Sequence, residues 1–212
     1  MKGTVAALLA RLRRELYSEE TFLVMRKDLD QIAVPKRPTG VLVEPLERGH
    51  LPLLARLNRE RDAADADARF AAYLDSGFEG FFAQLDGAAI GYYWWVDASK
   101  AADFPDLRDF GLGIELGPDE AYGSDFYIVE SHRNGQLAGE ILSQVEAGLR
   151  ERGFARLWGY VLSGNRPARW LYESRGYRWL WTHTRKNRFF MTRVGNSPVP
   201  GKTARGGLDV DR

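Results

Sequence analysis

Residues 125–139 combine residue types that can hold a charged phosphate group. The apolar run 126–129 predicts a strand, and the pattern over 137–149 predicts a helix after a turn that contains Arg133 and Gly135. The first turn of a helix has unpaired N–H groups and a partial positive charge. A strand, a glycine-containing turn and a helix start in this order therefore favour binding of an anion, of which diphosphate is a common cellular example.

A second segment with a chemical pattern covers residues 165–177, NRPARWLYESRGY. It follows a predicted strand and the turn Ser163-Gly164, and it predicts a short helix that ends at Gly176. Ala168 and Leu171 give this helix a small and an apolar position on one side.

The elements around these two segments alternate between strand and helix patterns. Asp86-Gly87 is typical of a tight hairpin turn, and residues 97–123 form a long connection that is typical of a lid, a substrate loop or a partly structured segment. We expect strands at 41–44, 81–85, 89–96, 124–129, 156–162, 177–182 and 188–194, and helices at 51–61, 64–76, 135–152 and 166–174.

The two ends of the chain differ from this central part. Residues 3–17 predict an amphipathic helix, residues 21–28 a strand, and residues 33–40 a linker with proline and glycine. We therefore divide the chain into an N-terminal helix and strand extension over 1–39, a main domain over 40–194, and a tail over 195–212 that we expect to be disordered. The N-terminal helix is a candidate element for a homodimer.

The composition excludes several classes of function. The chain has 212 residues, no cysteine and a formal net charge of +1, so disulfides, thiolate nucleophiles and a nucleic-acid partner are not expected. The three histidines, His50, His132 and His183, lie far apart, and no metal site is expected. No apolar run is long enough for a membrane span, so we expect a cytoplasmic protein without a membrane partner.

Together, the two chemical segments resemble the GNAT superfamily of N-acyltransferases, which use acyl-coenzyme A. The resemblance covers about residues 40–193. The diphosphate loop of the family has the pattern Arg/Gln-x-x-Gly-x-Gly/Ala, which aligns with Arg133 to Ala138. Gln136 occupies the position of the central glycine. It can still donate its backbone N–H to phosphate if it is helical and its side chain points away.

The resemblance implies an α/β (α+β) fold: a mixed, mostly antiparallel central sheet flanked by helices. It implies acetyl-CoA or another acyl-CoA as co-substrate, held where the strand at 124–129 separates from the strand at 155–161. The implied binding residues are Tyr127, Ile128, Val129, Arg133, Asn134, Gly135, Gln136, Leu137, Ala138, Gly139, Asn165 and Ala168. The backbone of the first three would pair with the pantetheine arm. Tyr172 matches the tyrosine that protonates the departing thiolate in this family.

The implied reaction moves an acyl group, expected to be acetyl, from acyl-CoA to an amine by direct attack in a ternary complex. An amine must be neutral to attack, so a base is expected, and the candidates are Glu115, Asp119, Glu120 and Asp125. Asp125 is the leading one, since it lies on the strand that would face the acyl group. His132, beside the loop, is expected to contact phosphate or solvent.

Two other functions stay open on the sequence. One is a catalytically idle module of the same fold that binds a ligand or partner, which the Gln136 substitution motivates. The other is a transferase that takes a longer acyl-CoA or a carrier-protein thioester. In addition, residues 92–95, YYWW, have one pair expected in the core, while the other pair either packs or lines the acceptor pocket.

Overall fold

The computed structural model of the chain describes residues 17–32, 39–60, 66–133, 135–188 and 191–199. Apart from Tyr17, the helix expected over residues 3–17 lies outside these residues, as do most of the expected linker, Asn134 and the end of the expected tail.

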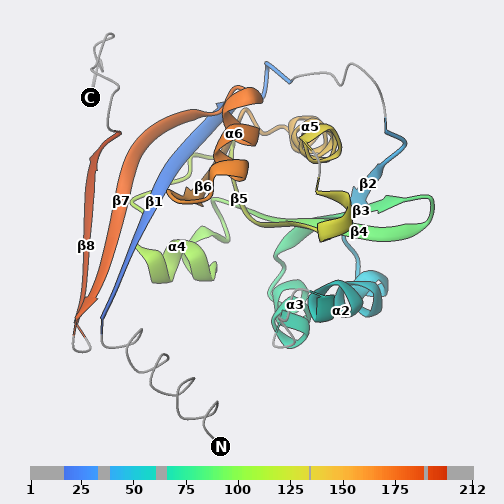
Figure 1. Cartoon of the computed structure of the whole chain (residues 1–212), viewed down its shortest axis with the longest axis horizontal. Helices are drawn as coiled ribbons and strands as arrows, with labels where there is room; N and C mark the ends of the chain where they lie inside the picture. Colours follow the sequence, from blue (N-terminus) through green and yellow to red (C-terminus); the bar gives the residue numbers. More distant parts are fainter. Residues whose placement is uncertain (1–16, 33–38, 61–65, 134, 189–190, 200–212) are drawn as a thin grey trace, which may run out of the picture.

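The described residues form one eight-stranded sheet with the order β2-β3-β4-β5-β6-β1-β7-β8 (Figure 1). Neighbouring strands are antiparallel except β5 and β6, which are parallel. The expected fold class, a mixed and mostly antiparallel sheet with flanking helices, is confirmed. The strands are β1 (Tyr17–Asp28), β2 (Leu42–Pro45), β3 (Glu79–Leu85), β4 (Ala88–Asp97), β5 (Glu120–Ile128), β6 (Arg156–Leu162), β7 (Arg178–Arg188) and β8 (Met191–Pro198).

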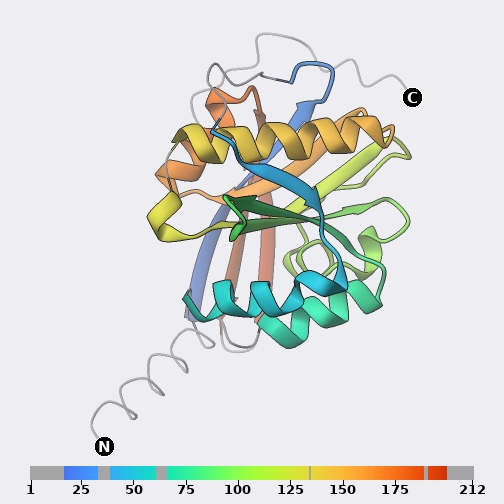
Figure 2. The same ribbon diagram turned by 90° about the vertical axis from the view of Figure 1, so that its right-hand side faces the viewer.

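The helices cover the sheet on two sides (Figures 1 and 2). On one side lie α5 (Gly135–Glu151) and α6 (Arg166–Ser174); on the other lie α2 (Leu51–Glu60), α3 (Ala66–Asp75) and α4 (Pro105–Phe110). Short 3-10 turns complete the described elements: η1 (Arg48–His50), η2 (Ala101–Asp103) and η3 (Glu130–His132). None of the described helices is long and apolar enough to cross a membrane.

The core follows the spacing of apolar residues in the sequence. Along α5, Leu137, Ile141, Val145 and Leu149 are each at most 2% exposed, at the three- to four-residue spacing of one helix face. The aromatic residues 92–95 of β4 are all at most 3% exposed, so both pairs pack in the core and neither lines an open pocket. The hairpin expected at Asp86-Gly87 joins β3 to β4, with positive φ at both turn residues.

The first strand of the chain is central in the sheet. β1 lies between β6 and β7 and pairs with both, and its residues 22–25 are buried. Lys27 of β1 forms a buried ion pair with Glu146 of α5, with 2.5 Å between Nζ and Oε2. The segment assigned to an N-terminal extension thus supplies a strand to the same sheet, whereas the domain boundaries themselves stay a prediction.

The last hairpin is longer than the sequence indicates. β7 runs without interruption from Arg178 to Arg188, and β8 continues to Pro198, past the boundary expected at residue 194. The polar run 183–188 does not alternate clearly between apolar and polar residues, but it pairs with residues 17–22 of β1 and 191–196 of β8. Pairing across the sheet therefore decides its conformation, which local pattern alone does not predict.

Candidate functional site

The sheet opens between its two parallel strands. β5 and β6 pair only from Glu120 with Arg156 to Tyr122 with Trp158, although both strands continue beyond these residues. The separation of these two strands that the resemblance implies is therefore confirmed.

A cavity of about 560 Å³ lies at this opening. Its walls come from the end of β5, the start of α5 and the first turns of α6. The lining residues are Phe126, Tyr127, Ile128, Arg133, Ala138, Asn165, Pro167, Ala168, Trp170 and Leu171. Six of the predicted binding residues are thus brought together here: Tyr127, Ile128, Arg133, Ala138, Asn165 and Ala168.

Near the start of α5, Arg133 and Ala138 line the cavity, whereas the predicted binding residues Gly135 and Gln136 are not among its lining residues. The helix begins at Gly135, and Gln136 is helical with an exposed side chain, which is the condition under which it can offer its backbone N–H. Arg133 is exposed, and its Nε donates a hydrogen bond of 2.7 Å to the carbonyl oxygen of Ile128. Its guanidinium carbon lies 5.3 Å from the ring centre of Tyr127.

Three other predicted binding residues, Val129, Leu137 and Gly139, do not line the cavity. Leu137 is buried in the core at 2% exposure, and Gly139 is buried under the side chain of Arg175. The N–H of Val129 donates to Ile90 of β4, and its carbonyl accepts from His132, so both of its backbone groups are used within the protein. Val129 is not among the lining residues of the cavity.

The helix α6 is fixed by its first residues. The side chain of Asn165 accepts a hydrogen bond of 3.2 Å from the backbone N–H of Ala168, so it caps the helix, and Pro167 lies in the first turn. This cap holds Ala168 and Leu171 toward the cavity.

Tyr172, the predicted acid, lies one residue beyond the cavity wall. It is 7% exposed, and its ring packs edge-on against Tyr177 with 4.8 Å between ring centres. Burial, followed by the negative charge of Glu146, raises the pKa of the Tyr172 phenol well above its usual value. The phenol therefore stays protonated throughout the physiological range of pH.

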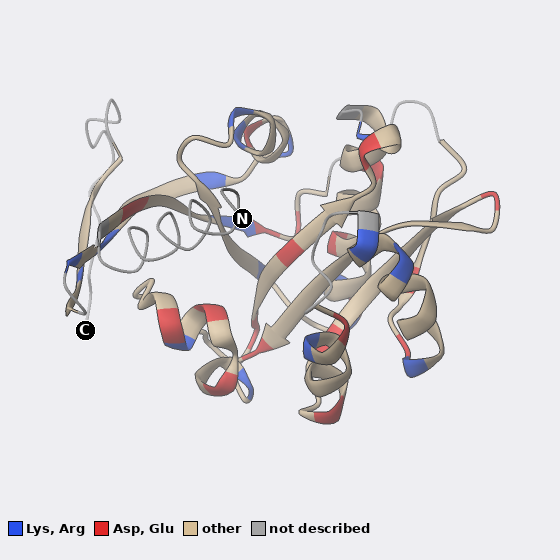
Figure 3. Cartoon of the chain, turned by 60° about the horizontal axis from the view of Figure 1, so that its bottom comes forward, with Lys and Arg blue, Asp and Glu red and all other residues tan. Residues whose placement is uncertain are grey.

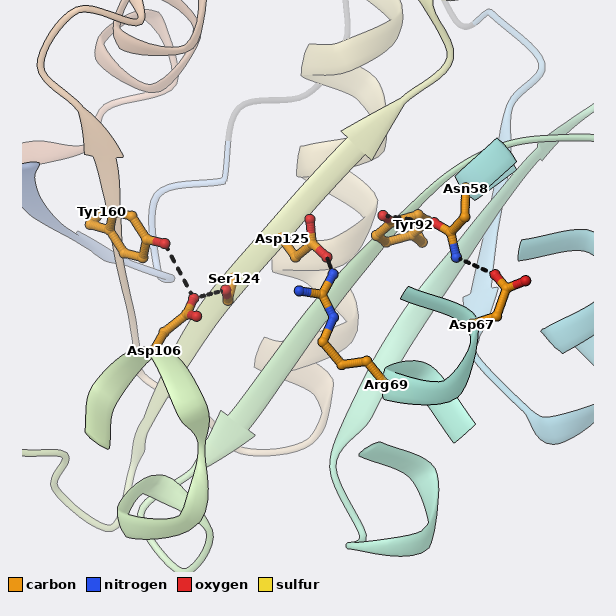
Figure 4. A network of polar contacts seen from close by, with 8 residues as sticks. All are labelled: Asn58, Asp67, Arg69, Tyr92, Asp106, Ser124, Asp125 and Tyr160. Atoms are coloured by element: carbon orange, nitrogen blue, oxygen red, sulfur yellow. Dashed lines mark hydrogen bonds and ion pairs between the residues drawn. The ribbon is translucent and has the colours of Figure 1, made fainter. Parts of the chain in front are cut away.

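Asp125, the predicted base, lies on an irregular part of β5. The register with β4 shifts between Tyr92 and Trp94, and Asp125 has a φ of 45°, which is unusual for a residue other than glycine. Its carboxylate forms an ion pair with Arg69 of α3, with 3.1 Å between Oδ2 and Nη2 (Figure 4). A Cβ on Gly91 of β4 would lie 2.4 Å from the carbonyl oxygen of Tyr127, so this bulge needs a glycine opposite it.

A second carboxylate, which the sequence did not predict, accepts a hydrogen bond from the residue before Asp125. Asp106 of α4 accepts hydrogen bonds from the hydroxyl of Ser124 on β5 and, at 3.4 Å, from the hydroxyl of Tyr160 on β6 (Figure 4). Burial raises the pKa of Asp106, although the hydrogen bond from Ser124 opposes the shift. The only signal for Asp106 in the sequence is its position in the long connection, directly after Phe104-Pro105.

The remaining base candidates lie away from the cavity. Glu120 and Asp119 are at the start of β5, whereas the cavity is at its end, and both contact Arg156. Hydrogen bonds from Gly117 and Arg156 lower the pKa of Glu120, although burial is the largest single influence and acts in the opposite direction. Glu115 is exposed on the loop before them.

His132 and His183 each contact a polar group of the protein. His132 is half-buried, and its Nδ1 lies 2.9 Å from the hydroxyl of Ser131. His183 is 1% exposed and lies 2.9 Å from the carbonyl oxygen of Phe110, the last residue of α4. Among the described residues, no group of three His, Asp or Glu side chains could hold a metal ion.

Acidic side chains are frequent on the side of the sheet that carries α3 and α4. Figure 3 shows red segments on α4, on the turn before it and along β5, with few blue segments between them. The acidic residues of α3, η2 and α4 are Asp67 and Asp75, Asp103, and Asp106 and Asp109, respectively, and those of β5 are Glu120 and Asp125.

Comparison with solved structures relates this fold to known proteins. A functionally unknown conserved protein from Staphylococcus epidermidis has a TM-score of 0.63 at 10% identity; the match covers 87% of this chain and 68% of that one. A putative GNAT-family acetyltransferase from Novosphingobium aromaticivorans has a TM-score of 0.52 at 18% identity, with 85% and 66% covered. A glucosamine N-acetyltransferase region of a fungal multi-domain β-N-acetylglucosaminidase has a TM-score of 0.59 at 13% identity, with 93% and 23% covered.

These likenesses, all under 25% identity, establish the fold alone, and this chain spans two thirds or less of the length of most of these proteins. No curated protein matches the sequence. The sequence model of the acetyltransferase (GNAT) family, however, matches residues 49–177, which include β5, all lining residues of the cavity, and both α5 and α6. The chain belongs to the GNAT acetyltransferase family.

Proposed function

We propose that this protein is an acyl-CoA-dependent N-acyltransferase that acetylates an amine, and that its acyl donor occupies the cavity between β5, α5 and α6. The observation that carries the proposal is the cavity of about 560 Å³ at the place where β5 and β6 separate, with a helix N-terminus at its border. Its volume is within the usual range for small-molecule sites, about 300–1,000 Å³. An acyl-CoA bound there supplies a thioester with an electrophilic acyl carbon.

In this proposal, different residues around the cavity bind different parts of the acyl-CoA. Arg133 and the first N–H groups of α5 provide positive charge and donors for a diphosphate at the cavity border. The backbone of Tyr127 and Ile128 presents a strand edge to which an extended amide-bearing arm can add. On α6, the small side chain of Ala168 leaves room in the cavity for this arm.

Two residues are proposed to act on the reacting groups. Tyr172 gives its proton to the departing sulfur, which a phenol kept protonated by its surroundings can do at neutral pH. Asp125 and its partner Arg69 orient the acceptor at the bulge of β5. The acceptor then attacks directly while both substrates are bound, because the donor and the acceptor approach the opening from opposite sides of the sheet.

A short acyl group is favoured by the wall at β5. The ring of Phe126 lines the cavity and packs against the buried Tyr93, with 5.5 Å between ring centres. A longer chain would have to displace this aromatic pair, so we expect acetyl-CoA to be preferred over octanoyl-CoA.

One observation favours a second function, an idle binding module. The Tyr172 side chain is buried and is not part of the cavity wall. Its hydroxyl could contact the sulfur of a bound thioester only after a small rearrangement of the surrounding side chains. Binding of acetyl-CoA without release of free thiol in the presence of any amine would favour this alternative.

The binding proposal is tested by calorimetric titration with acetyl-CoA. We expect binding at micromolar concentrations, and loss of binding in Ala168→Phe, whose ring would fill the cavity. Ala72→Phe is the matched control, because Ala72 is exposed on α3, across the sheet from the cavity. Equal binding by both variants, or no heat of binding to the unmodified chain, would reject the assignment of this cavity.

A further inference from the structure

The short helix α4 holds one carboxylate in a fixed place. Pro105 starts the helix, and Gly111 ends it in a left-handed conformation. Phe104 before the helix is 1% exposed and packs edge-on against Phe78, with ring centres 5.0 Å apart. Phe110 at its end stacks on Phe22 at 5.4 Å. Because Phe104 and Phe110 at the two ends of α4 each pack against a buried aromatic ring, the position of Asp106 in the first turn is well defined.

Asp106 lies where the two parallel strands separate. Its hydrogen bonds reach Ser124 on β5 and Tyr160 on β6, each two residues beyond the last paired residues, Tyr122 and Trp158. α4 is on the side of the sheet opposite to α5 and α6, which line the donor cavity (Figures 1 and 4). Asp106 is half-buried, so that one side of it can still be reached.

We propose that Asp106 is the base of the transfer reaction: it takes the proton of a primary amine that enters between α3 and α4. This inference rests on the proposed function and adds the residue and the side of entry. Asp106 Oδ accepts the proton that the nitrogen loses as its bond to the acyl carbon forms and the carbon–sulfur bond breaks. Tyr172 gives a proton to the sulfur. Asp106 then releases its proton to solvent and Tyr172 regains one, so the reaction balances for a neutral amine.

Two other carboxylates of β5 form ion pairs. Asp125 is ion-paired with Arg69, and Glu120 with Arg156, whereas the partners of Asp106 are two hydroxyls. A carboxylate without a cationic partner retains a proton more readily than a paired one, as a base must. The burial of Asp106, which raises its pKa, acts in the same direction.

A buried hydroxyl on the same face of β5 provides an independent observation. Tyr122 is two residues before Ser124, and the two side chains therefore point to the same side of the strand. Tyr122 is 0% exposed, and its hydroxyl has no hydrogen-bond partner in the described part of the chain. A buried hydroxyl without a partner beside Asp106 is consistent with a polar group, such as an amine or water, that binds between them.

The test is acetyl-CoA turnover, followed by thiol release, with spermidine, glucosamine and an alanine-initiated peptide as amines. We expect Asp106→Asn to lower kcat about 100-fold or more, with the dissociation constant for acetyl-CoA unchanged. Asp109→Asn is the matched control, because Asp109 is exposed on the same helix and forms an ion pair with Arg108. It should retain the activity of the unmodified chain.

A second variant tests the ionisation of Asp106 without removing it. Ser124→Ala deletes a hydrogen bond that stabilises the carboxylate, so the pKa of Asp106 should rise and the acid limb of the kcat–pH profile should move upward by about 0.5–1 pH unit. The titratable and charged groups that face Asp106 from other elements are Arg69 and Tyr73 of α3, Tyr122 and Asp125 of β5, and Tyr160 of β6.

The outcomes separate this inference from the proposed function. Turnover by the unmodified chain with an unchanged kcat in Asp106→Asn, or an equal loss in Asp109→Asn, overturns the role of Asp106 alone. An acid limb that does not move in Ser124→Ala also overturns it, even if Asp106→Asn does not fold. Absence of turnover by the unmodified chain with every amine overturns both proposals.

Discussion

At the scale of single residues, the two proposed proton-transfer groups have opposite surroundings. Tyr172 is buried, and its burial together with the negative charge of Glu146 raises the pKa of its phenol, which therefore stays protonated. Asp106 accepts hydrogen bonds from two hydroxyls, and its burial raises the pKa of its carboxyl. An acid and a base with pKa values separated by their environments are what a transfer to an amine requires.

The role of Tyr172 is tested by Tyr172→Phe. We expect kcat to fall about 100-fold with a nearly unchanged dissociation constant for acetyl-CoA, because only the proton donor is lost. Tyr177→Phe is the control, since Tyr177 is 5% exposed, equally aromatic and packed against Tyr172. A Tyr172→Phe enzyme as fast as the Tyr177→Phe enzyme would remove Tyr172 from the mechanism.

Residue types and spacing predicted residues of the cavity better than the polar contacts on the other side of the sheet. Arg133, Asn165 and Ala168 belong to short contiguous motifs, and all three line the cavity. Asp106 could not be predicted, because its partners Ser124 and Tyr160 are 18 and 54 residues away in sequence. The ion pair of Asp125 with Arg69, 56 residues away in sequence, could not be predicted for the same reason.

At the scale of elements, the start of α5 is the proposed diphosphate site, and its backbone can be tested directly. Gln136→Pro removes one N–H in the first turn, where proline is compatible with a helix. We expect the dissociation constant for acetyl-CoA to rise about 10-fold, as for the loss of a hydrogen bond to a charged group. Gln136→Ala keeps the N–H and should bind nearly as well as the unmodified chain; a loss as large as that of the proline variant would contradict a backbone role.

The contact between β1 and α5 contains the buried pair of Lys27 and Glu146. Replacing one member leaves the other charge buried alone, so Lys27→Met and Glu146→Leu should each lower the free energy of unfolding by about 3–5 kcal/mol. The double variant should lose far less than the sum of the two. Urea denaturation of all four proteins measures this, and additive losses would mean that the two charges do not stabilise each other.

The elements themselves were largely predictable, but their ends and irregularities were not. The apolar spacing in α5 and the Asp86-Gly87 turn indicate their structures locally. The bulge at Asp125 arises from pairing between β4 and β5, and the length of β7 from pairing with β1 and β8. Such features depend on partners distant in the sequence, which local periodicity does not contain.

At the scale of the whole molecule, the sheet connects both ends of the described chain. β1 lies between β6 and β7 and pairs with both. β6, which borders the opening, is therefore held on its other edge by β1. The side of the sheet with the proposed donor cavity carries α5 and α6, and the opposite side carries α2, α3 and α4 (Figure 2). In the proposed reaction, the two substrates therefore reach one opening from different sides.

The central position of β1 predicts the result of a truncation. A chain that begins at residue 40, the boundary indicated by composition, should lose its cooperative thermal transition, because β6 and β7 would each lose a paired neighbour and the buried residues 22–25 would be missing. Circular dichroism with temperature measures this. A cooperative transition together with acetyl-CoA binding in the truncated chain would mean that residues 40–194 fold as an independent domain.

The most direct test of the proposed function is acetyl transfer by the unmodified protein. Acetyl-CoA labelled in its acetyl group is incubated with spermidine, glucosamine or an alanine-initiated peptide, and both the free thiol and the labelled amide are measured. The account predicts equal amounts of the two products with at least one amine, and no amide when Ala168→Phe blocks the cavity. Absence of labelled amide with all three amines at about 1 mM acetyl-CoA, near the upper end of usual KM values, would contradict it.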